Sequence, residues 1–327
     1  MKKYLYIAIA AATLASCSQD EVMDVAEKEA ISFGNVYVGK STRAVDPSYS
    51  SNTIKSFRLF GTVNNVNIYN NVLVENKKSA DSNEEAGYGN EWYCPVTQYW
   101  ISDADYKFVA IVDGGKSGVT NTTIEGGMPT SITYTADGIT DLLCKTVTRK
   151  NDHSMVDFEF SHLLSKAKFT VDNTTPDATM YQHEIIGLKI SNAYSANSYN
   201  VVNASWGTAT PAVDGQSFDD IVVANTTEDT ECANEKLLIP GLTSATVEFT
   251  HILYYLTKDD QGNDVKKEVK RTAYTGENAL TAAITGGMKA NYSYNFTFSV
   301  GVGQKITFTV SQPTEWTSGG DHPLTAQ

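Results

Sequence analysis

The sequence has little that would support a metal centre or a catalytic site. Its four cysteines, Cys17, Cys94, Cys144 and Cys232, form no CxxC pair, and its five histidines are scattered. Zinc sites need clustered Cys and His ligands, so the spacing argues against zinc. No GxSxG motif is present, which argues against a hydrolase nucleophile elbow. We therefore expect no metal, no cofactor and no catalytic residue, and a protein that is not an enzyme.

Basic residues are also scarce. The 327 residues include 25 Lys and Arg against 38 Asp and Glu, which gives a net charge of −13 and a pI near 4.8. Phosphate binding needs a basic patch, so nucleic acid and anionic membrane surfaces are poor partners. Only 8 Pro and 23 Gly are present, which argues against a fibrous or disordered chain. The acidity suits a solvated, self-repelling surface.

The N-terminal apolar run is too short for a membrane span. Lys2 and Lys3 precede an apolar stretch over residues 4–14, which predicts a secretory signal peptide over residues 1–16. The sequence LASC, ending at Cys17, resembles a bacterial lipobox, which implies cleavage before Cys17 and acylation of its thiol, with palmitate as an expected lipid. The next four residues, SQDE, resemble the acidic signal that marks lipoproteins of Bacteroidia for the outer face of the outer membrane. The resemblance implies a precursor anchored to the outer membrane.

Residues 31–47, ISFGNVYVGKSTRAVDP, combine a core strand with a cleavable link. Ile31, Phe33, Val36 and Val38 alternate around a Gly-Asn break, which predicts a strand with one buried face. The following residues are small, polar and turn-prone, with two basic residues, Lys40 and Arg43, of which Arg43 directly precedes Ala44. A trypsin-like protease cuts at such exposed arginines. Cleavage there would take a strand from a sheet and leave an unpaired edge.

The rest of the chain is read as strand after strand, without a convincing amphipathic helix. Short alternating segments separated by turn signals predict an all-β protein. Two β-sandwiches in series are the simplest arrangement, over residues 44–153 and 154–327, with residues 17–43 as tether and removable first strand. Residues 256–265, LTKDDQGNDV, are read as a hairpin turn. Residues 139–150, ITDLLCKTVTRK, could form a short helix or a strand, and a short irregular segment is favoured.

Four features together resemble the fimbrillins of Bacteroidia, the type V pilins. They are the lipobox at Cys17, the strand followed by Arg43, the segment YWISDADYKFVAIV over residues 99–112, and VDFEFSHLLSKAKFTV over residues 156–171. The resemblance implies transthyretin-like, Greek-key sandwiches and cleavage by an Arg-specific protease between Arg43 and Ala44. The first strand then leaves with the anchor, and a strand from a neighbouring subunit fills the groove.

The family also implies a donor strand near the C-terminus. In stalk pilins it comes from the C-terminal region, which corresponds to residues 305–327 here. Ile306, Phe308 and Val310 alternate as a donor strand should, and the alternative is that they form a permanent strand of the C-terminal sandwich. In that case the donor lies around residues 316–324.

The expected function is a structural subunit of a cell-surface fimbrium that contributes to adhesion. Its expected partners are other pilin subunits, the Arg-specific protease and, through the lipid, the outer membrane. The alternative is a monomeric surface lipoprotein that binds a glycan or host ligand, and the sequence does not separate a stalk subunit from a tip or minor subunit.

Several residue groups have a structural and a functional interpretation. His162 is expected to be packed or hydrogen-bonded, and residues 259–264 are expected to be a hairpin tip instead of a calcium loop. Cys94 and Cys144 could form a disulfide or remain buried thiols. Exposed aromatics can stack on sugars, but most are expected in the core: Trp92, Tyr93, Tyr99, Trp100, Trp206 and Trp316.

Overall fold

The computed structural model describes residues 29–38, 54–76, 91–114, 120–150, 153–175, 178–211, 214–223, 229–231 and 234–316. Strands form nearly all the regular structure in these ranges, which confirms the all-β prediction. The helical elements described there are two three-residue 3₁₀ turns, η2 (Ala178–Met180) and η3 (Gly276–Asn278). In the described part of the chain, no helix is long and apolar enough to cross a membrane.

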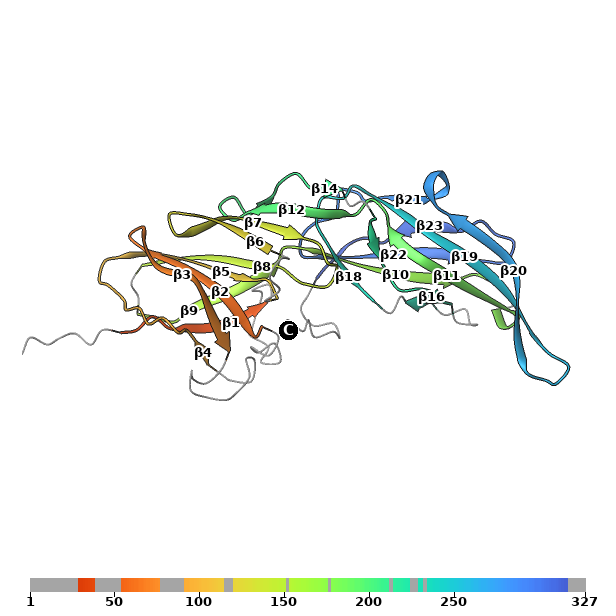
Figure 1. Cartoon of the computed structure of the whole chain (residues 1–327), viewed down its shortest axis with the longest axis horizontal. Helices are drawn as coiled ribbons and strands as arrows, with labels where there is room; N and C mark the ends of the chain where they lie inside the picture. Colours follow the sequence, from red (N-terminus) through yellow and green to blue (C-terminus); the bar gives the residue numbers. More distant parts are fainter. Residues whose placement is uncertain are drawn as a thin grey trace, which may run out of the picture.

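A seven-stranded sheet forms the first half of the elongated molecule (Figure 1). Its order is β1-β9-β8-β5-β2-β3-β4. The strands are β1 (Phe33–Val38), β2 (Ser56–Val63), β3 (Val66–Asn76), β4 (Trp92–Tyr93), β5 (Asp105–Val112), β8 (Leu143–Lys150) and β9 (Val156–His162). Residues from β1, β2, β3, β5, β8 and β9 share one buried cluster, so the sheet rolls around its own core.

A five-stranded sheet covers the outer face of this rolled sheet. Its members are β6 (Thr120–Glu125), β7 (Met128–Thr135), β12 (Tyr194–Asn200), β13 (Ser205–Trp206) and β14 (Thr210–Pro211). Val109 and Ile111 of β5 face Ile132 and Tyr134 of β7 in this second core. Phe108 of β5 points into the first core, so β5 is buried on both faces. This double burial explains the unbroken apolar run FVAIV over residues 108–112.

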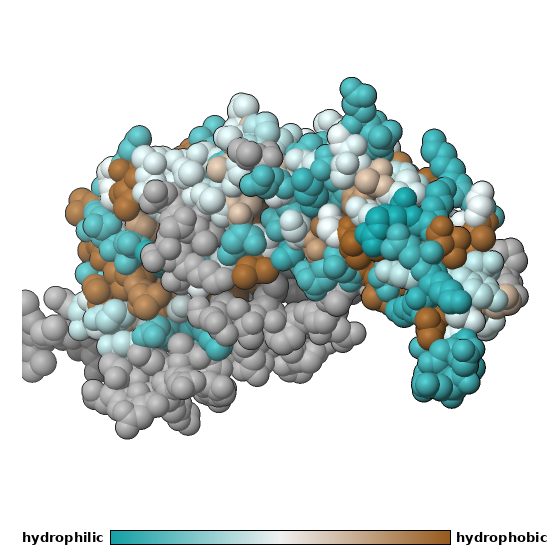
Figure 2. All heavy atoms as spheres, turned by 45° about the vertical axis from the view of Figure 1, so that its right-hand side comes forward, coloured by the Kyte–Doolittle hydropathy of each residue, from teal (hydrophilic) through white to brown (hydrophobic). Residues whose placement is uncertain are grey.

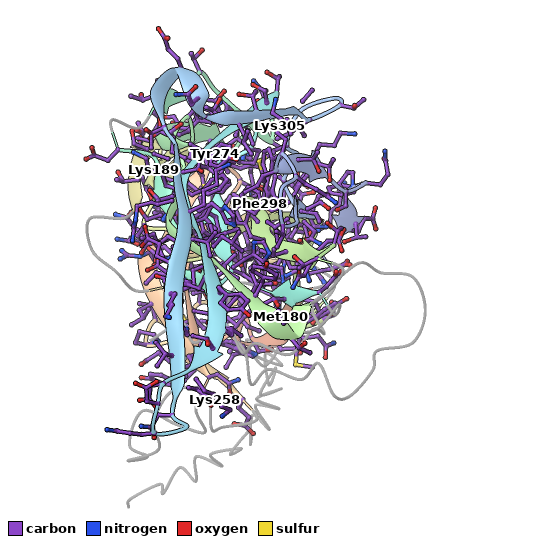
Figure 3. All side chains as sticks on the ribbon, turned by 90° about the vertical axis from the view of Figure 1, so that its right-hand side faces the viewer. Met180, Lys189, Lys258, Tyr274, Phe298 and Lys305 are labelled. Carbon is purple, nitrogen blue, oxygen red and sulfur yellow. The ribbon has the colours of Figure 1, made fainter. Side chains whose placement is uncertain are left out.

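Two six-stranded sheets form the second half. One contains β10 (Ser165–Asn173), β17 (Thr230–Glu231), β18 (Lys236–Leu238), β22 (Tyr292–Val300), β23 (Thr307–Val310) and β24 (Thr314–Glu315). The other contains β11 (Tyr181–Ile190), β15 (Gln216–Ser217), β16 (Ile221–Val222), β19 (Ser244–Lys258), β20 (Asp264–Tyr274) and β21 (Leu280–Ala283). Phe169, Phe249, Phe296 and Phe298 are stacked or tilted against one another between the sheets. Seen from the end of this half, Phe298 lies in the filled interior (Figure 3).

The expected division at residues 153 and 154 falls inside the seven-stranded sheet. β9 lies after this point, yet it pairs with β8 and β1. β12 also lies after it and pairs with β7 over five residues, from Ala196 opposite Thr135 to Asn200 opposite Ser131. Cutting the chain at residue 154 would therefore remove strands from both sheets of the first half.

Three local expectations have clear outcomes. The hairpin expected over residues 256–265 is confirmed, because β19 and β20 pair from Phe249 to Lys258. The prediction of an irregular segment over residues 139–150 is wrong, because Leu143–Lys150 is strand β8 and pairs along its whole length with β5. Cys94 and Cys144 are free thiols, so the disulfide alternative is not realised.

Candidate functional site

Strand β1 closes the rolled sheet. On one side it runs parallel to β9, with Phe33 opposite Val156 and Val38 opposite Phe160. On the other side, Ile31 donates its amide hydrogen to Gln98 O over 2.8 Å, and Ala30 forms an antiparallel bridge with Tyr99. The strand therefore lies between two segments far apart in the sequence, as expected for a strand that fills a gap.

A β-bulge at Gly34 and Asn35 sets the side-chain register. Between Phe33 and Val36, β1 has one residue more than the stretch of β9 with which it pairs. The Asn35 amide donates a hydrogen bond to Asp157 Oδ1 at 2.7 Å. A Cβ at position 34 would lie 2.5 Å from that oxygen, so any other residue would have to displace the Asp157 carboxylate. The bulge lets Phe33 and Val36, three positions apart, both face the core. The Gly-Asn break in the sequence is its signal.

Phe33 is the centre of the contact. Its ring lies 6.0 to 6.5 Å, centroid to centroid, from the rings of Phe57, Tyr69, Phe108 and Phe158. These four rings come from β2, β3, β5 and β9, so one side chain touches most of the sheet. Burying a phenylalanine stabilises a fold by roughly 1.5–3 kcal/mol. We call the surface formed by these four rings and the facing edge of β9 the β1 groove.

The buried face of β1 is continuous. Ile31, Phe33 and Val36 are only 6%, 5% and 3% exposed, which confirms the predicted buried face. By contrast, Tyr37 lies beside Glu159 of β9, and partial burial followed by the charges of Glu159 and Asp157 raises the pKa of its hydroxyl.

The floor of the groove is chemically inert. Burial raises the pKa of Tyr69 far above its usual value, and its hydroxyl has no hydrogen-bond partner. Burial likewise raises the pKa of the nearby Cys94 thiol. In the described ranges, no group of three or more His, Cys, Asp and Glu residues could hold a metal ion. The groove suits an extended apolar peptide, whose backbone hydrogen-bonds to β9 while alternate side chains occupy the floor.

The expected processing residues cannot be placed. Cys17, Arg43 and Ala44 lie outside the described residues. In the sequence, Arg43 follows the last residue of β1 by five positions and precedes β2.

The candidate donor residues lie on the second half of the molecule. Strand β23 pairs antiparallel with β22, with Phe308 opposite Phe298 and Val310 opposite Phe296. Ile306 is 3% exposed, whereas Phe308 and Val310 are half-buried against the same core. In this structure the three residues belong to the edge of their own sandwich, as the permanent-strand alternative describes, and β23 is four residues long.

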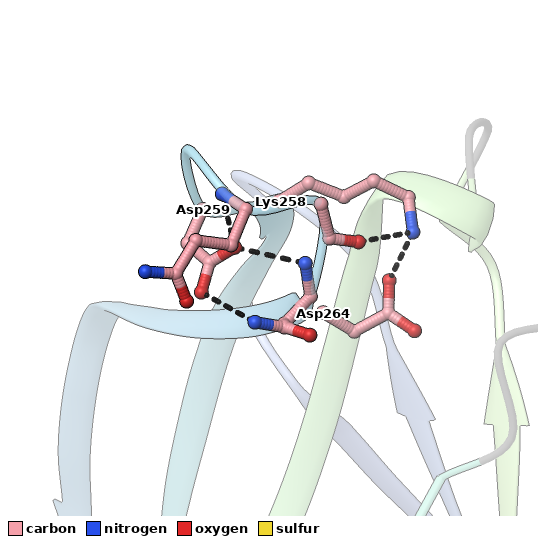
Figure 4. Close-up of polar contacts among 6 residues, drawn as sticks. Lys258, Asp259 and Asp264 are labelled. Atoms are coloured by element: carbon pink, nitrogen blue, oxygen red, sulfur yellow. Dashed lines mark hydrogen bonds and ion pairs between the residues drawn. The ribbon is translucent and has the colours of Figure 1, made fainter.

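The other singled-out residues have structural roles. The carboxylate of Asp259 accepts hydrogen bonds from the amides of Gln261 and Asn263, at 2.9 and 2.8 Å, and from the Asn263 side chain, at 3.0 Å (Figure 4). These bonds, led by the Asn263 side chain, lower the pKa of Asp259 and close the hairpin tip. Lys258 bridges Asp264 at 2.8 Å. The projecting hairpin is hydrophilic (Figure 2).

The aromatic residues divide by position. Trp100 is 6% exposed, and Trp92, Trp206 and Trp316 pack partly against the cores, as expected for most of them. Tyr99 is 45% exposed. His162 is buried and bonded to Asp141, which matches its structural interpretation. Sequence reasoning did not single out Asp141 or Asp157, because a lone carboxylate has no pattern to reveal its partner.

The fold and the groove define an all-β protein in which β1 fills a gap between two distant segments. A family model for fimbrillin-like proteins matches residues 42–319, and the chain belongs to that family.

Solved structures show the same fold at low identity. A fimbrial protein from Bacteroides vulgatus is similar with a TM-score of 0.62 and 16% identity, over 88% of this chain and 99% of that one. A candidate cell adhesion protein from Bacteroides ovatus has a TM-score of 0.50 and 16% identity, over 88% and 98%. No curated protein matches the chain.

Proposed function

We propose that the chain is a structural subunit of a cell-surface fimbrium, and not an enzyme, which polymerises when cleavage after Arg43 releases β1 from its groove. The observation that carries the proposal is the position of β1. It is a core strand, it precedes the cleavable link, and its removal would uncover four aromatic rings at once. Exposing so large an apolar surface in water is unfavourable, so a replacement strand would bind tightly.

Strand directions favour the C-terminal segment as the donor. β9 ends and β10 begins three residues later, where the two halves meet, so β10 runs away from the first half. β22 runs parallel to β10, and β23 returns antiparallel to β22. If β23 detaches from β22, the freed chain therefore leaves the molecule at the far end of the second half, after the turn at Gly301–Gln304.

The chain direction of such a donor strand matches that of β1. β1 begins at the outer end of the first half, beside residues 98–99, and runs parallel to β9 toward the junction of the two halves. A donor that comes from the far end of a neighbour would enter at the same outer end and run in the same direction. It would pair parallel with β9, as β1 does. Residues 307–327 would span up to about 70 Å when extended, which is ample for this reach.

A contact of this kind is head to tail. It joins the second half of one subunit to the first half of the next, does not close on itself, and generates a filament. Cys17 would hold the precursor on the outer membrane through its lipid until an Arg-specific protease cuts the link. The released body would then join other pilin subunits at the cell surface and contribute to adhesion.

The test is limited digestion of the purified precursor with an Arg-specific protease, which leaves the neighbouring Lys40 uncut. N-terminal sequencing identifies the cut, and an unheated denaturing gel detects polymers. The expected result is a core that starts at Ala44 and forms a ladder. Arg43→Ala is the matched control, because it removes the cut without touching a described core residue. A ladder from this variant, or a core from Ala44 that stays monomeric, would overturn the proposal.

A peptide tests the donor strand without changing the subunit. A synthetic peptide of residues 306–316, added in excess to freshly cut subunits, should shorten the ladder because it fills the groove. The control peptide carries Asp in place of Phe308 and Val310, which cannot be buried without a partner. Equal effects of the two peptides would show that these residues do not act as the donor.

A further inference from the structure

The last described residues are fixed at the junction of the two halves. β24 pairs with the start of β22, with Glu315 opposite Tyr292, and the Trp316 amide donates to Asn291 O at 2.8 Å. Both residues of β24 are exposed, so this strand buries little surface of its own. Trp316 is the residue that attaches the segment to the first half.

Trp316 lies flat on the ring of His162. The ring centroids are 3.5 Å apart and the planes are inclined by 6°. Lys166, at the start of β10, places its ammonium 5.4 Å from the centroid of the Trp316 ring and is held by Glu235 at 2.8 Å. The indole therefore contacts two side chains on either side of the β9–β10 turn.

His162 itself is rigidly held. Its side chain is 2% exposed, and its Nδ1 lies 2.6 Å from Asp141 Oδ2, whose side chain is 9% exposed. Its Nε2 is buried and has no hydrogen-bond partner. A buried nitrogen without a hydrogen-bond partner is unfavourable. When Trp316 leaves, water can reach His162 Nε2, which offsets part of the free energy lost with the ring stack. The stack is thus a specific contact that can open at moderate free-energy cost.

We infer that the stack of Trp316 on His162 is a catch that holds β23 and β24 on their own subunit and limits the release of the donor strand. The inference rests on the proposed strand exchange for its purpose, but the catch itself is a property of the uncut monomer. β23 makes four residue pairs with β22, and Ile306 and Phe308 pack in the core, so the stack is the anchor at the C-terminal end of the segment, where release would begin. Opening of the stack would free residues 314–316 and let β23 detach from β22 from that end.

Trypsin cleavage after Lys305 reports this release in a monomer that keeps β1, because Lys40→Ala and Arg43→Ala remove the trypsin sites in the link after that strand. Lys305 is exposed, but the next residue, Ile306, is 3% exposed, so cleavage requires the segment to open. The appearance of the fragment 306–327 is followed by mass spectrometry. Loss of the ring stack in Trp316→Ala should speed cleavage about tenfold. Trp316→Phe keeps a ring on His162 and should stay within about threefold of the wild type.

One further variant and a second measurement test the interpretation. Trp206→Phe removes the indole hydrogen bond to Leu163 O near the same junction without touching the tail, and should leave the cleavage rate unchanged. Hydrogen exchange at the β23 amides should accelerate in Trp316→Ala and not in Trp206→Phe. Cleavage and exchange in Trp316→Ala that stay within twofold of the wild type would overturn the catch.

The catch and the proposed function fail separately. If cut wild-type subunits form no ladder, strand exchange is wrong, while the monomer measurements still decide whether the catch exists. If ladders form, cut Trp316→Ala subunits should assemble with a shorter lag. An unchanged or longer lag would show that the catch does not limit donor release.

Discussion

Phe33 connects β1 to more of the sheet than any neighbour on its strand, because its ring meets rings from four other strands. Val36 and Ile31 add burial at either side. The free energy that holds β1 in its groove therefore depends strongly on this one side chain.

Phe33→Ala should destabilise the uncut precursor by about 3–5 kcal/mol, the usual effect of emptying a buried phenylalanine site. Denaturant unfolding measures this loss. Tyr37→Ala, on the half-exposed face of the same strand, is the control and should have a much smaller effect. Equal losses in both variants would contradict the central place of Phe33. After removal of β1, the body from Ala44 is the same polypeptide in both variants.

A pair of buried histidines lies in the second half. His183 and His251 are 0% and 7% exposed, with Nδ1 of the first 2.9 Å from Nε2 of the second, and Thr175 Oγ1 lies 2.8 Å from His183 Nε2. Burial lowers the pKa of His183 to about 4, and burial together with the charges of His183 and Lys270 lowers the pKa of His251 to about 4. The folded state thus keeps both rings neutral where the unfolded chain binds protons.

The pair should make the protein less stable in mild acid. Above pH 6.5 both states are neutral at these sites, so stability is complete there. As the pH falls from 6.5 to 4, the unfolded state alone gains protons, and each histidine reduces the free energy of unfolding by up to roughly 1.4 kcal/mol per pH unit. Urea unfolding at pH 7, 6 and 5 measures the slope.

The matched variants separate titration from packing. His183→Gln with His251→Gln should flatten the slope relative to the wild type. Ile185→Val, opposite His251 on β11, should lower stability equally at each pH because it does not titrate. A double variant as pH-sensitive as the wild type would show that other groups govern the acid response.

At the scale of elements, the sequence predicted strands well wherever one face is buried. It predicted β1 and its buried face, the strands on both sides of His162, and the β19–β20 hairpin. It missed β8 because that strand begins at Leu143 directly after Leu142, because the two leucines face different cores, and because the strand continues with half-buried and exposed residues. Alternation is lost when a strand begins buried on both sides.

A disulfide across β1 and β9 should lock the groove. Tyr37 and Glu159 are directly paired, so Tyr37→Cys with Glu159→Cys places two thiols on neighbouring strands. After cleavage at Arg43, the oxidised variant should keep β1 and form no ladder, and reduction should restore assembly. The single variant Tyr37→Cys is the control and should assemble under both conditions. Assembly of the oxidised double variant would show that β1 need not leave.

At the scale of the whole molecule, the sequence could not reveal which strands share a sheet. β12 returns from beyond residue 190 to pair with β7, and β1 reaches β9 across more than a hundred residues. Alternation reports that a strand buries one face, but not the surface against which it packs. The place of the groove therefore follows from the sequence only in part: the strand was predictable, its four aromatic contacts were not.

Net charge should control how fast cut subunits meet. Residues 1–43 contain five basic and five acidic residues, so the portion after the cut keeps the net charge of −13. Like-charged subunits repel over about 30 Å at 0.01 M salt and about 10 Å at 0.1 M. Light scattering should show faster assembly at the higher salt concentration. Slower assembly in 0.1 M salt would indicate that attraction between opposite charges guides the contact instead.

The orientation of β1 has a mechanical consequence. The strand runs close to the long axis of the molecule and is held along its length by β9 and by the aromatic rings beneath it (Figure 1). A strand seated in the same direction, when pulled along the axis of a chain of such subunits, would bear the tension in shear. Every hydrogen bond and every buried ring would resist together, whereas a strand peeled from one end would yield one contact at a time. Such a joint is built to carry load.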